Sequence, residues 1–146
     1  MTMSQSARPA AATLAIEHLT VALADGTALV DGLSLSLAAG ETLGLVGESG
    51  SGKSMTAHAI LGLFPGPGIH LAAGAIRLDG ADLAAMPSAA RRSLRGRRIG
   101  MIFQDPSLYL DPLLTAGRHI AEAFRVHGVA DRLADRVAQA LASVDL

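Results

Sequence analysis

Residues 47–54 read GESGSGKS, from Gly47 to Ser54, and this stretch decides the fold. It fits the pattern G-x-x-x-x-G-K followed by Ser or Thr at every fixed position. The apolar run before it, Thr42–Val46, is typical of a buried strand, and Met55–Phe64 after it is typical of a helix. A loop between a strand and a helix is the setting in which this pattern binds phosphate groups. The sequence therefore predicts a phosphate-binding loop.

The residue types in this loop suit an anionic ligand. Glycines allow positive φ and close backbone approach, so several N–H groups can turn toward one anion. The start of the following helix adds unpaired N–H donors and the positive end of its dipole. Lys53, the one lysine of the chain, is placed to reach the β- and γ-phosphates, and Ser54 offers a hydroxyl to Mg²⁺. The predicted nucleotide-binding residues are Gly47, Glu48, Ser49, Gly50, Ser51, Gly52, Lys53, Ser54 and Met55.

Length and composition limit the classes of function. A chain of 146 residues suits one domain, and 50% apolar residues with 3% aromatics predict an aliphatic core. The net charge of -1 argues against nucleic acid as a partner. The absence of cysteine excludes disulfides and thiolate metal sites within this sequence. Residues 1–12 are expected to be a disordered lead-in without the apolar region of a signal peptide, and no apolar run is long enough to span a membrane.

Several short strands are expected around the loop. Leu14–Leu23, Leu29-Val30 and Leu33–Leu37 precede it, separated by turns at Asp25-Gly26 and Asp31-Gly32, and this spacing predicts an antiparallel sheet beside the nucleotide core. After the loop helix we expect a strand over 74–80 that ends in a turn, a short helix from Pro87 to about Arg95, and a second buried strand, Arg98–Phe103. Helices are expected from an N-cap at Thr115 to a stop at Gly128, and over 131–142.

Gln104 is the second candidate site residue, because it directly follows the second predicted buried strand. Ligands of α/β sheets bind where strands end, and a glutamine carbonyl there can ligate Mg²⁺ or orient a water molecule. An ordinary loop glutamine remains the alternative on local sequence alone. The scattered histidines are interpreted as structural residues: His18, His58, His70, His119 and His127. The basic cluster is interpreted as a solvated face: Arg91, Arg92, Arg95, Arg97 and Arg98.

The chain resembles the ATP-binding subunits of ABC transporters, and within them the oligopeptide, dipeptide and nickel importer group. The resemblance runs in register over about residues 14–146. It is specific at Leu43–Ser54 and at Phe103-Gln104-Asp105-Pro106, which is similar to the Q-loop of that group. Looser matches lie at 60–63, 74–80, 94–99, 113–117 and 120–122.

This resemblance implies an α/β P-loop NTPase core of the ABC ATPase type with an antiparallel β-subdomain over residues 13–112, and the start of a helical subdomain over 113–146. It implies binding of ATP and Mg²⁺, with Lys53 and Gln104 as the catalytic residues and Ser54 and Gln104 at the metal. Gln104 would touch Mg²⁺ and the attacking water. It also implies an energy-coupling subunit of an importer for peptides or nickel. Such a subunit dimerises with a second ABC ATPase on the cytoplasmic membrane face and couples through the Q-loop to a membrane permease. A substrate-binding protein delivers the cargo to that permease.

Two departures from the family pattern are visible. The position of the adenine-stacking aromatic residue holds Leu23. No stretch matches the signature motif, the second acidic strand with its catalytic glutamate, or the switch histidine, so the resemblance covers an N-terminal half, a truncated ABC ATPase. Because that glutamate has no counterpart, we expect weak or no ATP hydrolysis by these residues alone, and marginal stability. A non-transport ABC-type ATPase and a non-catalytic remnant that only binds nucleotide are the alternatives.

Overall fold

The computed structural model describes residues 13–146, and the predicted lead-in over residues 1–12 lies outside the described residues. The chain forms two compact units, one that ends at Ile99 and one over Gly100–Leu146. The first unit holds the sheet and the phosphate-loop helix. The second unit is helical and contains Gln104.

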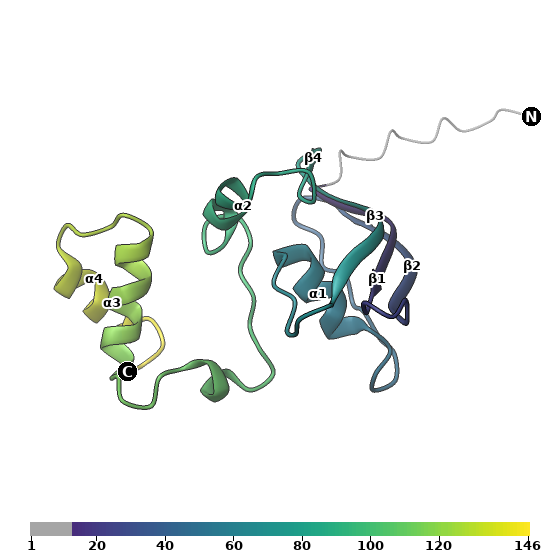
Figure 1. Cartoon of the computed structure of the whole chain (residues 1–146). Helices are drawn as coiled ribbons and strands as arrows, with labels where there is room; N and C mark the ends of the chain where they lie inside the picture. Colours follow the sequence, from purple (N-terminus) through teal and green to yellow (C-terminus); the bar gives the residue numbers. More distant parts are fainter. Residues whose placement is uncertain (1–12) are drawn as a thin grey trace, which may run out of the picture. The chain divides into compact units, whose positions relative to one another are not determined.

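In the described part of the first unit, four strands form an antiparallel sheet in the order β2-β1-β3-β4 (Figure 1). They are β1 (Leu14–Ala22), β2 (Ala28–Leu37), β3 (His70–Leu78) and β4 (Ala81–Asp82). The predicted antiparallel sheet is confirmed. The predicted turn at Asp31-Gly32 is wrong, because β2 runs through it as a local irregularity: Gly32 has φ +61 and its N–H donates to Thr20 Oγ1 at 3.2 Å.

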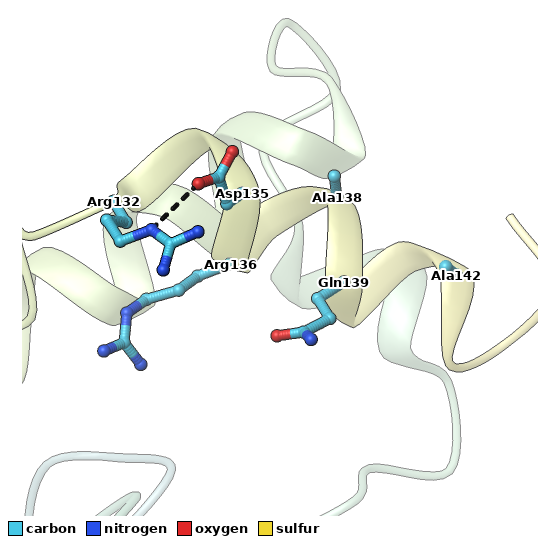
Figure 2. A pocket seen from close by; sticks show the side chains of 6 residues that line it. All are labelled: Arg132, Asp135, Arg136, Ala138, Gln139 and Ala142. Carbon is cyan, nitrogen blue, oxygen red and sulfur yellow. Dashed lines mark hydrogen bonds and ion pairs between the residues drawn. The ribbon is translucent and has the colours of Figure 1, made fainter.

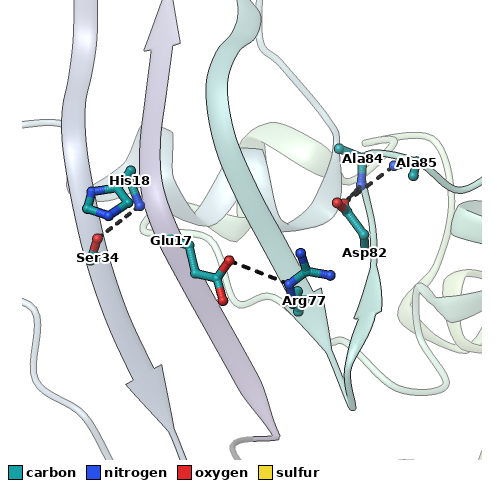
Figure 3. Close-up of polar contacts among 7 residues, drawn as sticks. All are labelled: Glu17, His18, Ser34, Arg77, Asp82, Ala84 and Ala85. Atoms are coloured by element: carbon teal, nitrogen blue, oxygen red, sulfur yellow. Dashed lines mark hydrogen bonds and ion pairs between the residues drawn. The ribbon is translucent and has the colours of Figure 1, made fainter.

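A bulge in β1 brings its apolar residues to one face. Ile16 and Leu19 are both buried although three positions apart, and the two residues between them, Glu17 and His18, are exposed. Strict alternation would send Ile16 and Leu19 to opposite faces, so the pairing register shifts at this point in both ladders. The outward groups are satisfied locally (Figure 3): the His18 N–H donates to Ser34 Oγ at 2.9 Å, and Glu17 pairs with Arg77 at 3.5 Å.

The core lies between the sheet and helix α1 (Lys53–Leu61) (Figure 1). Ala59 of α1 packs with buried side chains of the strands, and Met55, Ile60 and Phe64 are partly buried against the same cluster. The strand and turn members of this cluster are Ile16, Leu19, Val21, Val30, Ile76 and Leu83. Truncating one of these large side chains to Ala would cost about 2–5 kcal/mol. The aliphatic core expected from the composition is therefore observed, and it fixes α1 against the sheet.

The two predicted buried strands, one before the phosphate loop and one before Gln104, are absent. Thr42–Val46 and Arg98–Phe103 have no strand structure, apart from an isolated bridge between Arg95 and Ile99. Residues 42–46 are exposed, with Val46 93% exposed. In 98–103 Ile102 is 94% exposed, whereas Ile99 packs against the core and Met101 and Phe103 are half-buried. A strand exists only where its backbone groups pair with a neighbour, and within residues 13–146 neither segment has a ladder partner. Apolar composition alone was therefore a misleading signal here.

The short helix α2 (Ser88–Leu94) is attached to α1 by arginines. The Arg95 side chain donates from Nε to the Leu61 carbonyl oxygen at 3.1 Å, at the C-terminal end of α1. Arg91 lies against Gly62, close enough that its Nη1 would be 2.5 Å from a Cβ placed there. Arg98 forms an ion pair with Asp79. The solvated interpretation of the basic cluster is thus wrong for Arg91 and Arg95, which pack on α1.

The second unit contains a 3-10 helix, η1 (Pro106–Tyr109), and the helices α3 (Ala116–Val126) and α4 (Leu133–Ala142), which pack against each other (Figure 1). Both helix-boundary predictions for α3 are confirmed: Thr115 caps it by accepting from the Arg118 N–H, and Gly128 follows it with φ +75. Over 100–146 no residue is fully buried. This unit therefore lacks a core of its own.

Candidate functional site

The predicted phosphate loop leads directly into α1. Residues 47–51 are exposed, Gly52 precedes the helix with φ +86, and α1 begins at Lys53. The left-handed conformation is one reason for glycine at position 52. The other is contact with β2, because a Cβ on Gly52 would lie 2.6 Å from the Leu29 carbonyl oxygen. The loop is thus anchored to the sheet through a position that no other residue type can occupy without a shift.

Lys53 turns back over the loop that precedes it. Its Nζ donates to the carbonyl oxygens of Gly47 at 2.7 Å and Glu48 at 2.6 Å, and to Ser51 Oγ at 3.0 Å. These contacts hold the ammonium group at the mouth of the loop and use its three donors. Gly47 lines the same small space, since a Cβ there would lie 2.7 Å from Ser51 Oγ.

A hollow of about 400 Å³ opens beside Lys53. One side is formed by the phosphate loop with Gly47, Gly50 and Ser51, and the other by residues of β2 and the segment before the loop. The latter residues are Ala28, Leu29, Val30, Asp31, Leu33, Leu45 and Val46. Sequence reasoning missed the β2 side of the hollow, because strand pairing and the packing of α1 bring it to the loop. No local spacing in the sequence signals that proximity.

The loop fits a phosphate group with a bound cation. The small residues Gly47, Gly50 and Ser51 line the loop side of the hollow, α1 begins beside it, and the one lysine lies at the mouth of the loop. Ser54 is in the first turn of α1 and exposed, so its hydroxyl can serve as a cation ligand. Met55 is instead half-buried against the core, which leaves its backbone as the group that can contact a ligand.

Gln104 lies in the second unit, exposed, in a segment without regular structure that leads into η1. Asp105 caps η1: its Oδ1 accepts the Ser107 N–H at 3.1 Å. The basis of the Gln104 prediction, a preceding buried strand, is absent. Its contribution to a nucleotide site rests on the sequence motif and stays a prediction.

Other surfaces offer less chemistry. One hollow lies along α4 alone (Figure 2), where Arg132 pairs with Asp135 at 3.1 Å beside Arg136 and Gln139. Both charged groups of that pair are largely exposed, so it has the character of an ordinary helix surface. Among the described residues no group of three or more His, Cys, Asp or Glu side chains is arranged to hold a metal. Over the same range, every helix is too short or too polar to cross a membrane.

Comparison with known proteins defines the class. The family model described as ABC transporter matches residues 30–146. The chain is 45% identical over 117 residues to the peptidoglycan transport ATP-binding protein YejF of Agrobacterium fabrum, covering 78% of this chain and 21% of that one. It is 43% identical over 119 residues to the dipeptide transport ATP-binding protein DppD of Escherichia coli, covering 80% of this chain and 36% of the relative. The chain thus spans about a fifth to a third of such relatives.

A solved structure supports the fold. A bacterial Atm1-family ABC exporter with ATP bound matches with a TM-score of 0.50 at 23% identity, over 82% of this chain and 21% of that one. At this identity the likeness concerns the fold alone. Together with the family match over 30–146, it makes the conclusion plain: the chain belongs to the ABC transporter family of ATP-binding proteins, and it carries part of the ABC ATPase fold.

Proposed function

We propose that this chain binds ATP with Mg²⁺ through the loop of residues 47–54, as part of the energy-coupling ATPase of a peptide importer. The observation that supports it most is the construction of the loop. Lys53, the close-packed Gly47 and the start of α1 meet at one point beside a hollow of about 400 Å³. Membership of the ABC transporter family agrees with that reading.

The roles of the side chains follow from their chemistry. The backbone N–H groups of 47–55 would surround the phosphates, and Lys53 would exchange its carbonyl partners for β- and γ-phosphate oxygens. Ser54 would ligate Mg²⁺, and Gln104 would complete that ligation and orient water. Bound Mg²⁺ supplies neutralisation of the phosphate charge. The base would rest on the aliphatic side of the hollow, near Leu29 and Leu45, because Leu23 replaces the aromatic residue of the family.

The proposed role in transport rests on the similar proteins. Their names refer to transport of peptidoglycan and dipeptides, which favours peptides over nickel as cargo for this chain's system. We propose that it works in a dimer of ABC ATPases, attached to permease subunits at the cytoplasmic face of the membrane, with a substrate-binding protein that delivers the cargo. Copurification with a permease would separate this assignment from a non-transport ATPase.

Removal of the lysine ammonium tests nucleotide binding. In titration calorimetry of the 146-residue chain with MgATP, Lys53→Ala should weaken binding roughly 10- to 100-fold, since hydrogen bonds to charged groups contribute about 1.5–3 kcal/mol. The matched control is Arg92→Ala, which removes the same charge from an exposed position on α2 and should stay within about twofold of the unmodified chain.

Either of two results would overturn the proposal. The unmodified chain could take up no ATP, or Lys53→Ala could bind as tightly as Arg92→Ala does. The second result would move the site away from the loop, since each variant removes one positive charge and only one of the two charges lies at the loop.

A further inference from the structure

The segment that carries Gln104 is closed by an aromatic pair. The rings of Phe103 and Tyr109 stack with their centroids 3.9 Å apart and 21° between their planes. Phe103 directly precedes Gln104, and Tyr109 is the last residue of η1. The stack therefore joins the two ends of a short loop, and Gln104 lies inside it.

Local contacts are the main support of this loop. Asp105 Oδ1 accepts the Ser107 N–H at 3.1 Å and also the Ser107 hydroxyl, which fixes the first turn of η1. At the other end, the Leu110 N–H donates to the Ser107 carbonyl oxygen at a long 3.4 Å. No described strand continues into residues 100–110, so a sheet does not impose the backbone path. The ring stack spans the whole loop.

We propose that the Phe103–Tyr109 stack is a clasp that holds this loop in one conformation, and that Tyr109 is thereby a positioning residue for Gln104. The part that concerns Gln104 rests on the proposed role of that residue at Mg²⁺. An aromatic pair of this kind favours the closed loop over open forms by roughly 2- to 10-fold. A glutamine that must reach a metal and a water works best when its backbone is held before the ligand arrives.

The clasp can be observed directly, because Tyr109 is the sole tyrosine and the chain has no tryptophan. The tyrosine band in near-ultraviolet circular dichroism therefore reports on this one ring, and it is lost when side-chain packing is lost. Phe103→Leu should reduce the band toward that of the denatured chain. Leu108→Ala, at a neighbouring side chain that is 78% exposed, should leave it unchanged. An unchanged band in Phe103→Leu would overturn the clasp, whether or not the chain binds ATP.

Positioning is tested by the Mg²⁺-dependent gain in ATP affinity, measured with and without the cation. Tyr109→Leu should reduce that gain roughly 2- to 10-fold and leave Mg²⁺-free ATP binding unchanged, whereas Tyr109→Phe keeps the ring and should behave as the unmodified chain. Tyr109→Met is a second non-aromatic variant, and far-ultraviolet spectra check that each one folds. Equal Mg²⁺ gains in all four proteins would overturn positioning. An unmodified chain that binds no ATP would instead contradict the proposed function, and the dichroism result would still decide the clasp.

Discussion

At Gly74 the backbone of β3 comes so close to β1 that no side chain fits between the two strands. Gly74 has φ +87, and a Cβ there would lie 2.5 Å from the Glu17 carbonyl oxygen and closer still to that of His18. This is the point at which the bulge in β1 turns two consecutive residues outward. The glycine is therefore part of the bulge, and the bulge is what buries both Ile16 and Leu19.

Gly74→Ala should destabilise the first unit by about 2–4 kcal/mol, because it combines the cost of a left-handed alanine with a backbone collision. Gly80→Ala is the matched control: Gly80 has φ +82 but open space where its Cβ would lie, so about 1–2 kcal/mol is expected from the backbone conformation alone. Chemical denaturation followed by far-ultraviolet circular dichroism measures both. Equal losses would show that the strands separate at Gly74 at no cost.

Single residues with local signals were predictable from the sequence. The helix after the loop, predicted from Met55 and observed from Lys53, the cap at Thr115 and the stop at Gly128 each depend on neighbours within a few positions. The positive φ of His18 and the bulge at that residue were not predictable from the sequence, because they follow from the pairing of β1 with strands that lie distant in the sequence.

At the scale of elements, α2 and α1 are joined by Arg95. Its guanidinium donates to the Leu61 carbonyl oxygen at the end of α1, a group that no further turn of helix satisfies. A positive charge there also interacts favourably with the negative end of the helix dipole. Because the same helix begins at the phosphate loop, this contact supports the site from its far end.

Arg95→Ala should lower the free energy of unfolding by about 1–2 kcal/mol, since a partly buried carbonyl loses a charged donor. Arg92→Ala, on the exposed side of α2, should change it by no more than about 0.5 kcal/mol. Thermal unfolding of both variants provides the comparison. If the two are equally stable, the Arg95 contact is merely a surface interaction, as the sequence had suggested for the whole basic cluster.

Strands were predictable from their apolar patterns only where a partner strand is present in the chain. β1 lies between β2 and β3 in the sheet, and apolar patterns located all three, although β2 was expected as two strands and β3 only from Gly74 on. Thr42–Val46 has an equally apolar pattern, yet it is exposed and unpaired, because composition does not reveal whether a neighbouring strand is present. Arg98–Phe103, the predicted strand before Gln104, likewise forms no strand, although Ile99 packs against the core.

For the whole molecule, stability should be divided unequally between the two units. The first has a core with Leu19 and Val21 fully buried, and residues 100–146 have no buried side chain. Native-state hydrogen exchange should therefore protect the amides of β1 most and those of α3 and α4 least, by at least about 2 kcal/mol in opening free energy. The protection of β2 amides, which belong to the same sheet as β1, is the internal reference for the protection of the α3 and α4 amides. Equal protection of α3 and β1 would contradict this division.

The three hydrogen bonds that Lys53 donates to its own loop affect which anions can bind there. Its ammonium is already within 2.6–3.0 Å of three oxygens, so an incoming anion must offer enough acceptors to compensate for the partners that it replaces. Chloride offers one centre and a single charge, and cannot do so. A polyphosphate offers many oxygens and several charges, and it also takes up the N–H groups at the start of α1. The loop should consequently bind a polyphosphate in strong preference to chloride.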